Sequence, residues 1–189
     1  MYEANPLSLE IADILKRRGY ERRDQPFTLT SGATSHDYID GKLAIAEGSV
    51  LRRIGEAVVE VVGEPFDFVG GLTMGADPLA HAVAMVAGAQ WFSVRKAAKG
   101  HGTGAFLEGG RLTAGARVVL VDDVVTTGGS TLIALERIRA AEPSINVIVA
   151  VALCDRGDTA GPALAAAGVR WSPLTTYREM GIDPILPVD

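Results

Sequence analysis

The chain has 189 residues, the length of one ordinary domain, and can bury a core without disulfides or a structural metal. Hydrophobic residues make up 48% and charged residues 22%, which excludes a disordered or fibrous chain. The net charge of -5 argues against nucleic-acid binding, and the single cysteine, Cys154, excludes a disulfide framework. The longest apolar stretch, 145–154, is far shorter than the roughly 18 residues of a membrane span. No signal-peptide pattern opens the chain, so we expect a cytoplasmic protein without membrane contact.

The first predicted element is a helix that begins after Asn5-Pro6, an N-cap followed by a first-turn proline, and ends at Gly19. Two short strands, 27–31 and 38–39, are predicted around the turn Ser31-Gly32, and a second helix begins at Gly48. We expect a single domain over residues 1–189, in which residues 1–45 form a small N-terminal hood.

Strands and helices alternate from residue 66 onward. The predicted strands are 66–69, 91–94, 117–121, 147–153 and 169–174, and the predicted helices between them are 78–87, 129–140 and 159–167. Strands that are apolar throughout are typical of a sheet buried on both faces. The pattern predicts an α/β fold with a mostly parallel central sheet and helices on both faces, whose ligands bind beyond the carboxyl ends of the strands.

The most informative segment is 118–131, which reads VVLVDDVVTTGGST. An apolar strand runs into two acids, and a loop of threonine, glycine and serine then precedes a helix. Amides at a helix N-terminus suit a phosphate group, and glycines permit close backbone approach. Carboxylates suit ribose hydroxyls, so Asp122 and Asp123 followed by this loop indicate a ribose 5′-phosphate site. The alternative is that the acids cap a loop and the glycines form a plain turn; neither the Walker A nor the dinucleotide pattern is present.

All thirteen positions from Val118 to Ser130 resemble the 5-phosphoribosyl 1-diphosphate (PRPP) motif of the type I phosphoribosyltransferases. The resemblance implies the fold of that family. It also implies that the acids contact the ribose hydroxyls, with Asp123 catalytic, and that the loop holds the 5′-phosphate. The PRPP-binding residues implied by this motif are Asp122, Asp123, Thr126, Thr127, Gly128, Gly129 and Ser130.

A second segment, 94–110, places four cations within seven residues: Arg95, Lys96, Lys99 and His101. Such runs are often solvated surface loops. Next to a PRPP site, however, positioned cations stabilise the charge that develops on departing diphosphate, and a closing loop excludes water.

The pattern R-K-x-x-K-x-H-G in this segment resembles the flexible catalytic loop of orotate phosphoribosyltransferases. The resemblance implies that all four cations bind PRPP and that Lys99 and His101 are catalytic. It also implies a homodimer in which the 95–104 loop reaches the neighbouring active site. Ala97 and Gly100 stand where the family often has acids.

Residues 27–40, FTLTSGATSHDYID, resemble the family's F-x-L-x-S-G-x-x-S-x-x-Y motif, which forms the hood over the base. Without the other motifs, this segment is a plain hairpin with a core tyrosine. The pair Asp155-Arg156 resembles the family's pair near the base, which implies an ion pair between Arg156 and orotate, although a surface arginine is the alternative. The implied orotate-binding residues are Ser31, Gly32, Tyr38, Thr127 and Arg156.

Together the motifs imply transfer of 5-phosphoribosyl from PRPP to orotate, giving orotidine 5′-monophosphate and diphosphate in pyrimidine biosynthesis. The implied cofactor is Mg²⁺, held mainly by diphosphate, ribose hydroxyls and water rather than by protein ligands. Two alternatives stay open. Thr30 and Met74 replace lysines found in many or some members, which permits a different base. A PRPP-sensing regulator with weak activity is the other, and the cationic loop argues against it.

Overall fold

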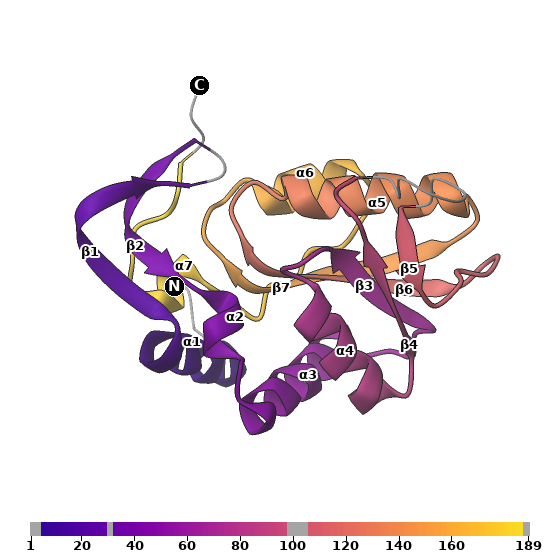
Figure 1. The fold of residues 1–189 in the computed structure, drawn as a ribbon, viewed down its shortest axis with the longest axis horizontal. Coiled ribbons are helices and arrows are strands. Elements are labelled where there is room, and N and C mark those ends of the chain that lie inside the picture. Colours follow the sequence, from indigo (N-terminus) through magenta and orange to yellow (C-terminus); the bar gives the residue numbers. More distant parts are fainter. Residues whose placement is uncertain (1–4, 30–31, 98–105, 187–189) are drawn as a thin grey trace.

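The computed structural model describes residues 5–29, 32–97 and 106–186, and Figure 1 shows their fold. The helices are α1 Pro6–Arg18, α2 Gly41–Ala44, α3 Gly48–Val62, α4 Asp77–Ala87, α5 Gly129–Ala141, α6 Ala160–Ala166 and α7 Tyr177–Met180. The strands are β1 Tyr20–Thr28, β2 Thr34–Ile39, β3 Phe68–Leu72, β4 Gln90–Val94, β5 Leu107–Gly109, β6 Arg117–Val125, β7 Asn146–Asp155 and β8 Thr175–Thr176.

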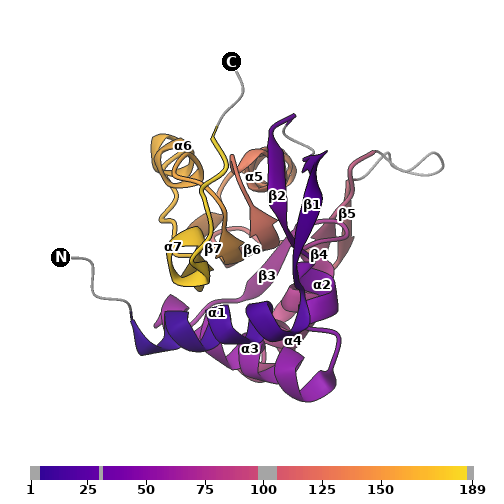
Figure 2. The same ribbon diagram turned by 90° about the vertical axis from the view of Figure 1, so that its left-hand side faces the viewer.

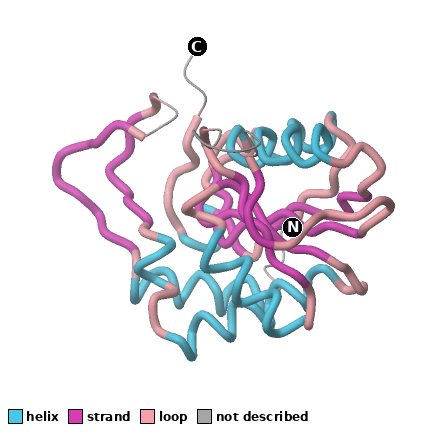
Figure 3. Tube along the Cα trace, turned by 45° about the vertical axis from the view of Figure 1, so that its right-hand side comes forward, coloured by secondary structure: helices cyan, strands magenta, loops and turns pink. Residues whose placement is uncertain are grey.

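The central sheet has the strand order β5-β4-β3-β6-β7-β8. Its neighbours pair in parallel except β5, which pairs antiparallel with β4 at the edge. Helices α5 and α6 lie over one face, and α1, α3 and α4 lie over the other (Figure 1). Figure 3 shows the same arrangement, with the strands gathered between the helical layers. The predicted α/β fold with a mostly parallel sheet is therefore confirmed.

Strand β6 shows why the core has two halves. Val118 and Leu120 pack into the cluster that includes the buried side of α5, whereas Val119 and Val121 pack into the cluster that includes α3 and α4. All four are at most 1% exposed. Because successive side chains of a strand point to opposite faces, an apolar strand without alternation must be covered on both sides.

The N-terminal segment adds a separate two-stranded sheet, β1-β2, to this body. Helix α1 begins as predicted, because the Asn5 side chain accepts a hydrogen bond from the Leu7 amide at 3.0 Å. The strands of the hairpin are longer than the sequence predicted. The hairpin stands away from the central sheet in Figure 1, and Figure 2 shows its two strands from the side that faces away from the sheet.

One predicted strand is wrong. Within 169–174, Trp171 forms an isolated bridge with Ala150, and the regular strand β8 comes later, at Thr175–Thr176. The stretch still runs along β7, because the Ser172 and Leu174 amides donate to the Ala150 and Ala152 carbonyls at 3.0 and 2.8 Å, but it does not form a continuous ladder. Short elements whose patterns are too brief to recognise were not predicted at all: α2, β5 and α7. In the described part of the chain, each helix is too short or too polar to cross a bilayer.

Candidate active site

A cavity of about 510 Å³ lies beyond the carboxyl ends of β3 and β6. The loop after β3, the end of β6, the start of α5 and the hairpin with α2 contribute to its wall. The structure brings together in this wall most of the site residues predicted from sequence: Tyr38, Lys96, Asp122, Asp123, Thr126, Thr127, Gly128, Gly129, Ser130 and Arg156. Three distant stretches of sequence therefore meet at the position that the fold class predicts for a ligand.

The two acids at the end of β6 have different surroundings. Asp122 is 6% exposed, and one of its carboxylate oxygens accepts the Asp123 amide at 3.0 Å. Asp123 accepts the Val124 amide at 2.8 Å and faces Lys42 of α2, whose ammonium lies 3.1 Å from the other carboxylate oxygen. One carboxylate is therefore buried in the wall, and the other is held between its own strand and the hood.

Burial and the neighbouring charge of Asp123 raise the pKa of Asp122 to about 7. The facing carboxylate of Asp123 raises the pKa of Lys42, so the ammonium stays charged. The pair therefore presents one carboxylate with a permanent counter-ion and one that exchanges its proton near neutral pH. Hydroxyl groups that donate to Asp122 favour its ionised form.

The loop between β6 and α5 has the geometry of an anion cradle. Gly128 precedes the helix with φ 79°, a left-handed conformation that favours glycine, and no side chain caps the helix. The amides at the start of α5 thus meet the cavity with the positive end of the helix dipole. The Thr159 hydroxyl donates to the Thr126 carbonyl at 3.1 Å and secures the start of the loop.

The loop after β3 passes unusually close to the acids. A Cβ atom on Gly75 would lie 2.6 Å from a carboxylate oxygen of Asp123 and 3.0 Å from one of Asp122. Glycine is therefore required for the loop to line the same cavity without displacing the carboxylates.

Arg156 follows β7 and is 2% exposed, so it is not a surface arginine. Its Nη1 donates to the Asp37 carbonyl at 2.8 Å and its Nη2 to the Ser35 hydroxyl at 3.4 Å. Its Nε is buried with no hydrogen-bond partner in the described part of the chain. Burial lowers the pKa of this guanidinium without neutralising it. A buried cation with a spare donor at a cavity wall suits an anionic ligand.

Two basic residues of the cationic loop, Arg95 and Lys96, are among the described residues. Lys96 lines the main cavity and also a second cavity of about 490 Å³, whereas Arg95 lines the second cavity and not the main one. The Arg95 guanidinium pairs with Glu108 at 3.3 Å. Ser31, Lys99 and His101 lie outside the described residues. Gly32 has φ 86° in the hairpin turn and is exposed, and it is not among the residues of the cavity wall.

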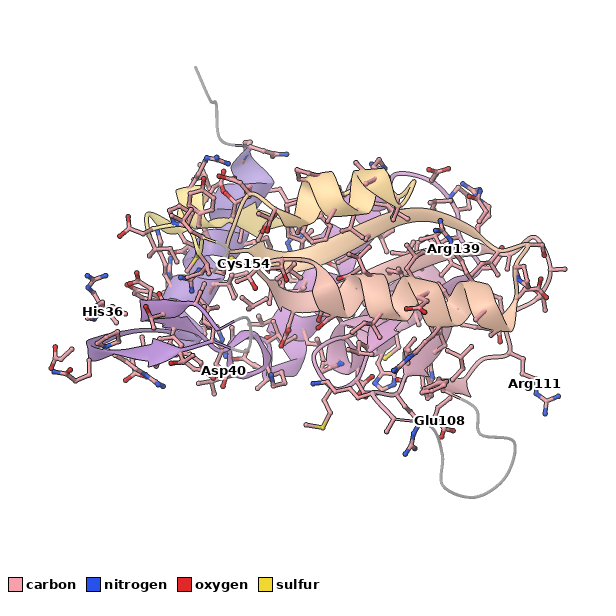
Figure 4. All side chains as sticks on the ribbon, turned by 90° about the horizontal axis from the view of Figure 1, so that it is seen from above. His36, Asp40, Glu108, Arg111, Arg139 and Cys154 are labelled. Carbon is pink, nitrogen blue, oxygen red and sulfur yellow. The ribbon has the colours of Figure 1, made fainter. Side chains whose placement is uncertain are left out.

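Lys42 of the wall could not be predicted from the sequence, because nothing in its local pattern places it opposite an acid 81 residues later. The loop residues Thr73, Met74 and Gly75 also line the cavity. Their segment, Gly70–Pro78, resembles the diphosphate-binding loop of the type I phosphoribosyltransferases, which predicts a place for it near the site. His36 is exposed and lies at the far edge of the hairpin (Figure 4).

Among the described residues, no group of three or more His, Cys, Asp or Glu side chains is arranged to hold a metal ion. Two adjacent carboxylates in a cavity fit a different arrangement, in which a hard cation arrives on phosphate and hydroxyl oxygens and keeps part of its water.

The comparisons with known proteins first define the class. Residues 45–168, about two thirds of the chain, match the model of the phosphoribosyl transferase domain, and the match includes the acid pair, the cradle and Arg156.

Full-length relatives define the family more closely. An orotate phosphoribosyltransferase of Methanoculleus marisnigri is 40% identical over 154 residues, covering 82% of this chain and 87% of the relative. An orotate phosphoribosyltransferase of Nostoc sp. is 33% identical over 191 residues, which cover 95% of this chain and 91% of the relative. The crystal structure of Mycobacterium tuberculosis orotate phosphoribosyltransferase in complex with PRPP is similar with a TM-score of 0.76 and 29% identity, covering 94% of this chain and 100% of that chain. The chain belongs to the orotate phosphoribosyltransferase family, as the sequence motifs predicted.

Proposed function

We propose that this chain transfers 5-phosphoribosyl from PRPP to orotate and releases orotidine 5′-monophosphate and diphosphate, the activity for which its relatives are named. One observation carries the proposal. A single cavity joins a buried guanidinium, Arg156, to an acid pair and a phosphate cradle. The presence of these groups in one cavity wall suits a ligand that combines a carboxylate-bearing base with a ribose phosphate.

In the proposed reaction, a nitrogen of orotate forms a bond to C1 of the ribose as the bond from C1 to the diphosphate oxygen breaks. The diphosphate leaves with the bonding electrons, and the ribose carries partial positive charge in the transition state. Asp122 and Asp123 hold the ribose hydroxyls through their carboxylates, and the amides and hydroxyls of residues 126–130 hold the 5′-phosphate. Tyr38 packs on the base, and Arg156 pairs with its carboxylate.

Mg²⁺ bound to the diphosphate and ribose oxygens would neutralise charge on the leaving group. Asp122 and Asp123 would hold such an ion indirectly, through the ribose hydroxyls or water. Lys96, Lys99, His101 and Arg95 complete the binding of the diphosphate.

The homodimer is part of the proposal. Arg95 does not line the main cavity of its own chain, which is compatible with a 95–104 loop that reaches the neighbouring site, where Arg95, Lys99 and His101 act. Lys96, at the base of the loop, acts in the cavity of its own chain. Residues 1–45 act as the hood of a single domain, and the family match beginning at residue 45 is compatible with that division. We place the activity in the cytoplasm.

Substrate choice tests the function directly. Loss of orotate absorbance is followed after addition of PRPP and Mg²⁺, in parallel with uracil, hypoxanthine and adenine. Uracil is the sharpest comparison, because it lacks the carboxylate that Arg156 binds. Faster conversion of uracil or a purine would assign the chain to another base, and no conversion of any base with intact PRPP binding would favour a regulator.

Arg156→Gln sharpens this test. It removes the charge, so kcat/KM for orotate is expected to fall at least about 100-fold, in the range of a lost charged hydrogen-bond pair. The Kd for PRPP in the absence of orotate is expected to change by a much smaller factor. Arg170→Gln is the matched control, since Arg170 also donates to a distant carbonyl, that of Val62, at 3.1 Å, and lies outside the cavity wall.

The shared site is tested by mixing Lys99→Ala with Asp123→Ala chains after confirmed subunit exchange. Each homodimer should be nearly inactive. Random one-to-one mixing should restore about a quarter of the wild-type sites, because mixed dimers contain one site with both defects and one with neither. Activity that stays at the level of the single variants would place the loop in its own site.

A further inference from the structure

Arg137 of α5 contacts both ends of the connection between β4 and β5. Its Nη1 donates a hydrogen bond to the Arg95 carbonyl, and its Nη2 donates to the Lys96 carbonyl at 3.0 Å. Its Cζ lies 4.2 Å from the centre of the Phe106 ring, at the other end of the connection. One half-buried side chain therefore joins residues that are ten positions apart in the sequence.

The two ends are also joined to each other. Val94 pairs with Leu107 in the antiparallel ladder, and the Arg95 amide donates to the Phe106 carbonyl at 2.8 Å. On the β4 side, the pairing with β3 ends at Leu72 and Val94, where the Val94 carbonyl accepts the Thr73 amide at 2.8 Å. Arg137 extends the attachment beyond the sheet, because it ties Arg95, Lys96 and Phe106 to helix α5.

Helix α5 is a suitable anchor. Its first residue, Gly129, belongs to the phosphate cradle, and its buried side is fixed in the core by Ala134, Leu135 and Ile138. Arg137 lies two turns further along, about 12 Å at the rise of an α-helix. The cradle and the base of the cationic connection are thus held by one rigid element.

The geometry of the contact restricts Lys96 in particular. A guanidinium has planar donors in a fixed fork, so donating to two consecutive carbonyls fixes the orientation of the peptide between them. That peptide carries the Lys96 side chain into the main cavity. Arg95 on the same stretch turns to Glu108 instead. A small rotation of the peptide would change which cation meets the cavity.

We propose that Arg137 is a positioning residue of the transfer reaction, which holds the Arg95–Lys96 backbone on α5 and so directs Lys96 at the diphosphate end of PRPP. Arg137 itself touches no substrate atom. The inference rests on the proposed PRPP site, and it predicts that a residue outside the cavity wall controls PRPP use.

Proteolysis tests the anchoring without reference to activity. Trypsin cleaves after Arg95 and Lys96 at the same carbonyls that accept hydrogen bonds from Arg137. In Arg137→Ala, native-state cleavage at these two bonds should accelerate at least about threefold, as local opening becomes easier. Fragment masses identify the bonds. Arg139→Ala is the matched control, because Arg139 also donates to a carbonyl, that of Ala167, at 3.0 Å. It lies on the side of α5 away from Glu108 (Figure 4).

Kinetics and calorimetry test the positioning. Arg137→Ala should lower kcat/KM for PRPP about tenfold while KM for orotate changes little, and should weaken binding of PRPP measured by calorimetry. Arg137→Lys keeps the charge but not the fork, so it should recover only part of the loss. Melting temperatures of all variants show whether each is folded under the assay conditions.

The outcomes separate this proposal from the proposed function. Unchanged cleavage after Arg95 and Lys96 in a folded Arg137→Ala protein would overturn the anchor. Faster cleavage with wild-type PRPP binding and kinetics would overturn the positioning role. If the wild-type protein converts no orotate, the proposed function fails, and calorimetric binding of PRPP to wild type and Arg137→Ala still decides the inference.

Discussion

The two ends of the main cavity are built in different ways. The proposed ribose-phosphate end comes from one continuous stretch, residues 122–130, in which a buried strand leads directly into a cradle and a helix. The proposed base end is assembled from separate places, Tyr38 on β2 and Arg156 after β7, and Lys42 on α2 joins the hood to Asp123. A continuous element fixes its own geometry, whereas the assembled end depends on contacts between the hairpin and the sheet. Changes at the first end should therefore affect the chemistry locally, and changes at the second should also disturb the hood.

The largest effect is expected at the ribose-phosphate end. Asp123→Asn keeps the shape but loses the charge that accepts the ribose hydroxyls, so turnover should fall at least about 100-fold. Steady-state kinetics with saturating orotate measures this effect, and Asp13→Asn, on exposed α1, is the control. Turnover within about threefold of wild type, under roughly 1 kcal/mol, would remove Asp123 from the reaction.

The pH dependence of stability comes next. The folded chain raises the pKa of Asp122 from 3.8 to about 7, so between these values the folded state holds a proton that the unfolded state has lost. The free energy of unfolding of the wild type relative to Asp122→Asn should therefore fall as pH rises from about 4 to 7, by roughly 2 kcal/mol or more. Urea unfolding at several pH values measures it. A difference that is flat or rises over this window would contradict the burial argument.

Gly75→Ala tests the close approach of the β3 loop to the acids. The added methyl group would lie 2.6 Å from an Asp123 oxygen, so the loop or the carboxylate must move, and kcat/KM for PRPP should fall about tenfold. Gly48→Ala is the matched control, because no atom lies within 4 Å of its added Cβ. Equal kinetics for the two variants would mean that the loop moves away without consequence.

Lys42→Gln should give the smallest effect. It leaves Asp123 without its counter-ion 3.1 Å away, and KM for PRPP should change about fivefold. Lys16→Gln, which loses a hydrogen bond to the Glu179 carbonyl outside the cavity, is the control. Equal KM values for PRPP in Lys42→Gln and Lys16→Gln would show that the contact of Lys42 with Asp123 does not contribute to PRPP binding.

The same contrast explains what the sequence could predict. The sequence predicts strand β6, the acid pair Asp122 and Asp123 and the cradle that follows them, because these features are consecutive in the chain and therefore lie next to one another in space. Lys42 could not be predicted, because its partner lies 81 residues away and its own segment is a four-residue helix. Arg95 and Lys96 are adjacent, but the sequence does not tell that one faces the cavity and the other Glu108. The misplaced strand at 169–174 has a similar cause, since apolar composition alone does not reveal that this stretch forms an isolated bridge at Trp171 and that the regular ladder begins at Thr175.

The hydrogen bonds of Arg156 to the Asp37 carbonyl and the Ser35 hydroxyl also have an evolutionary consequence. The Arg156 guanidinium, which we propose binds the acidic base, also connects the end of β7 to β2 through these hydrogen bonds. A descendant that exchanged this arginine to accept a neutral base would loosen its own hairpin in the same step. A change of base preference at this position therefore removes two hydrogen bonds that hold the hairpin, unless another contact replaces them.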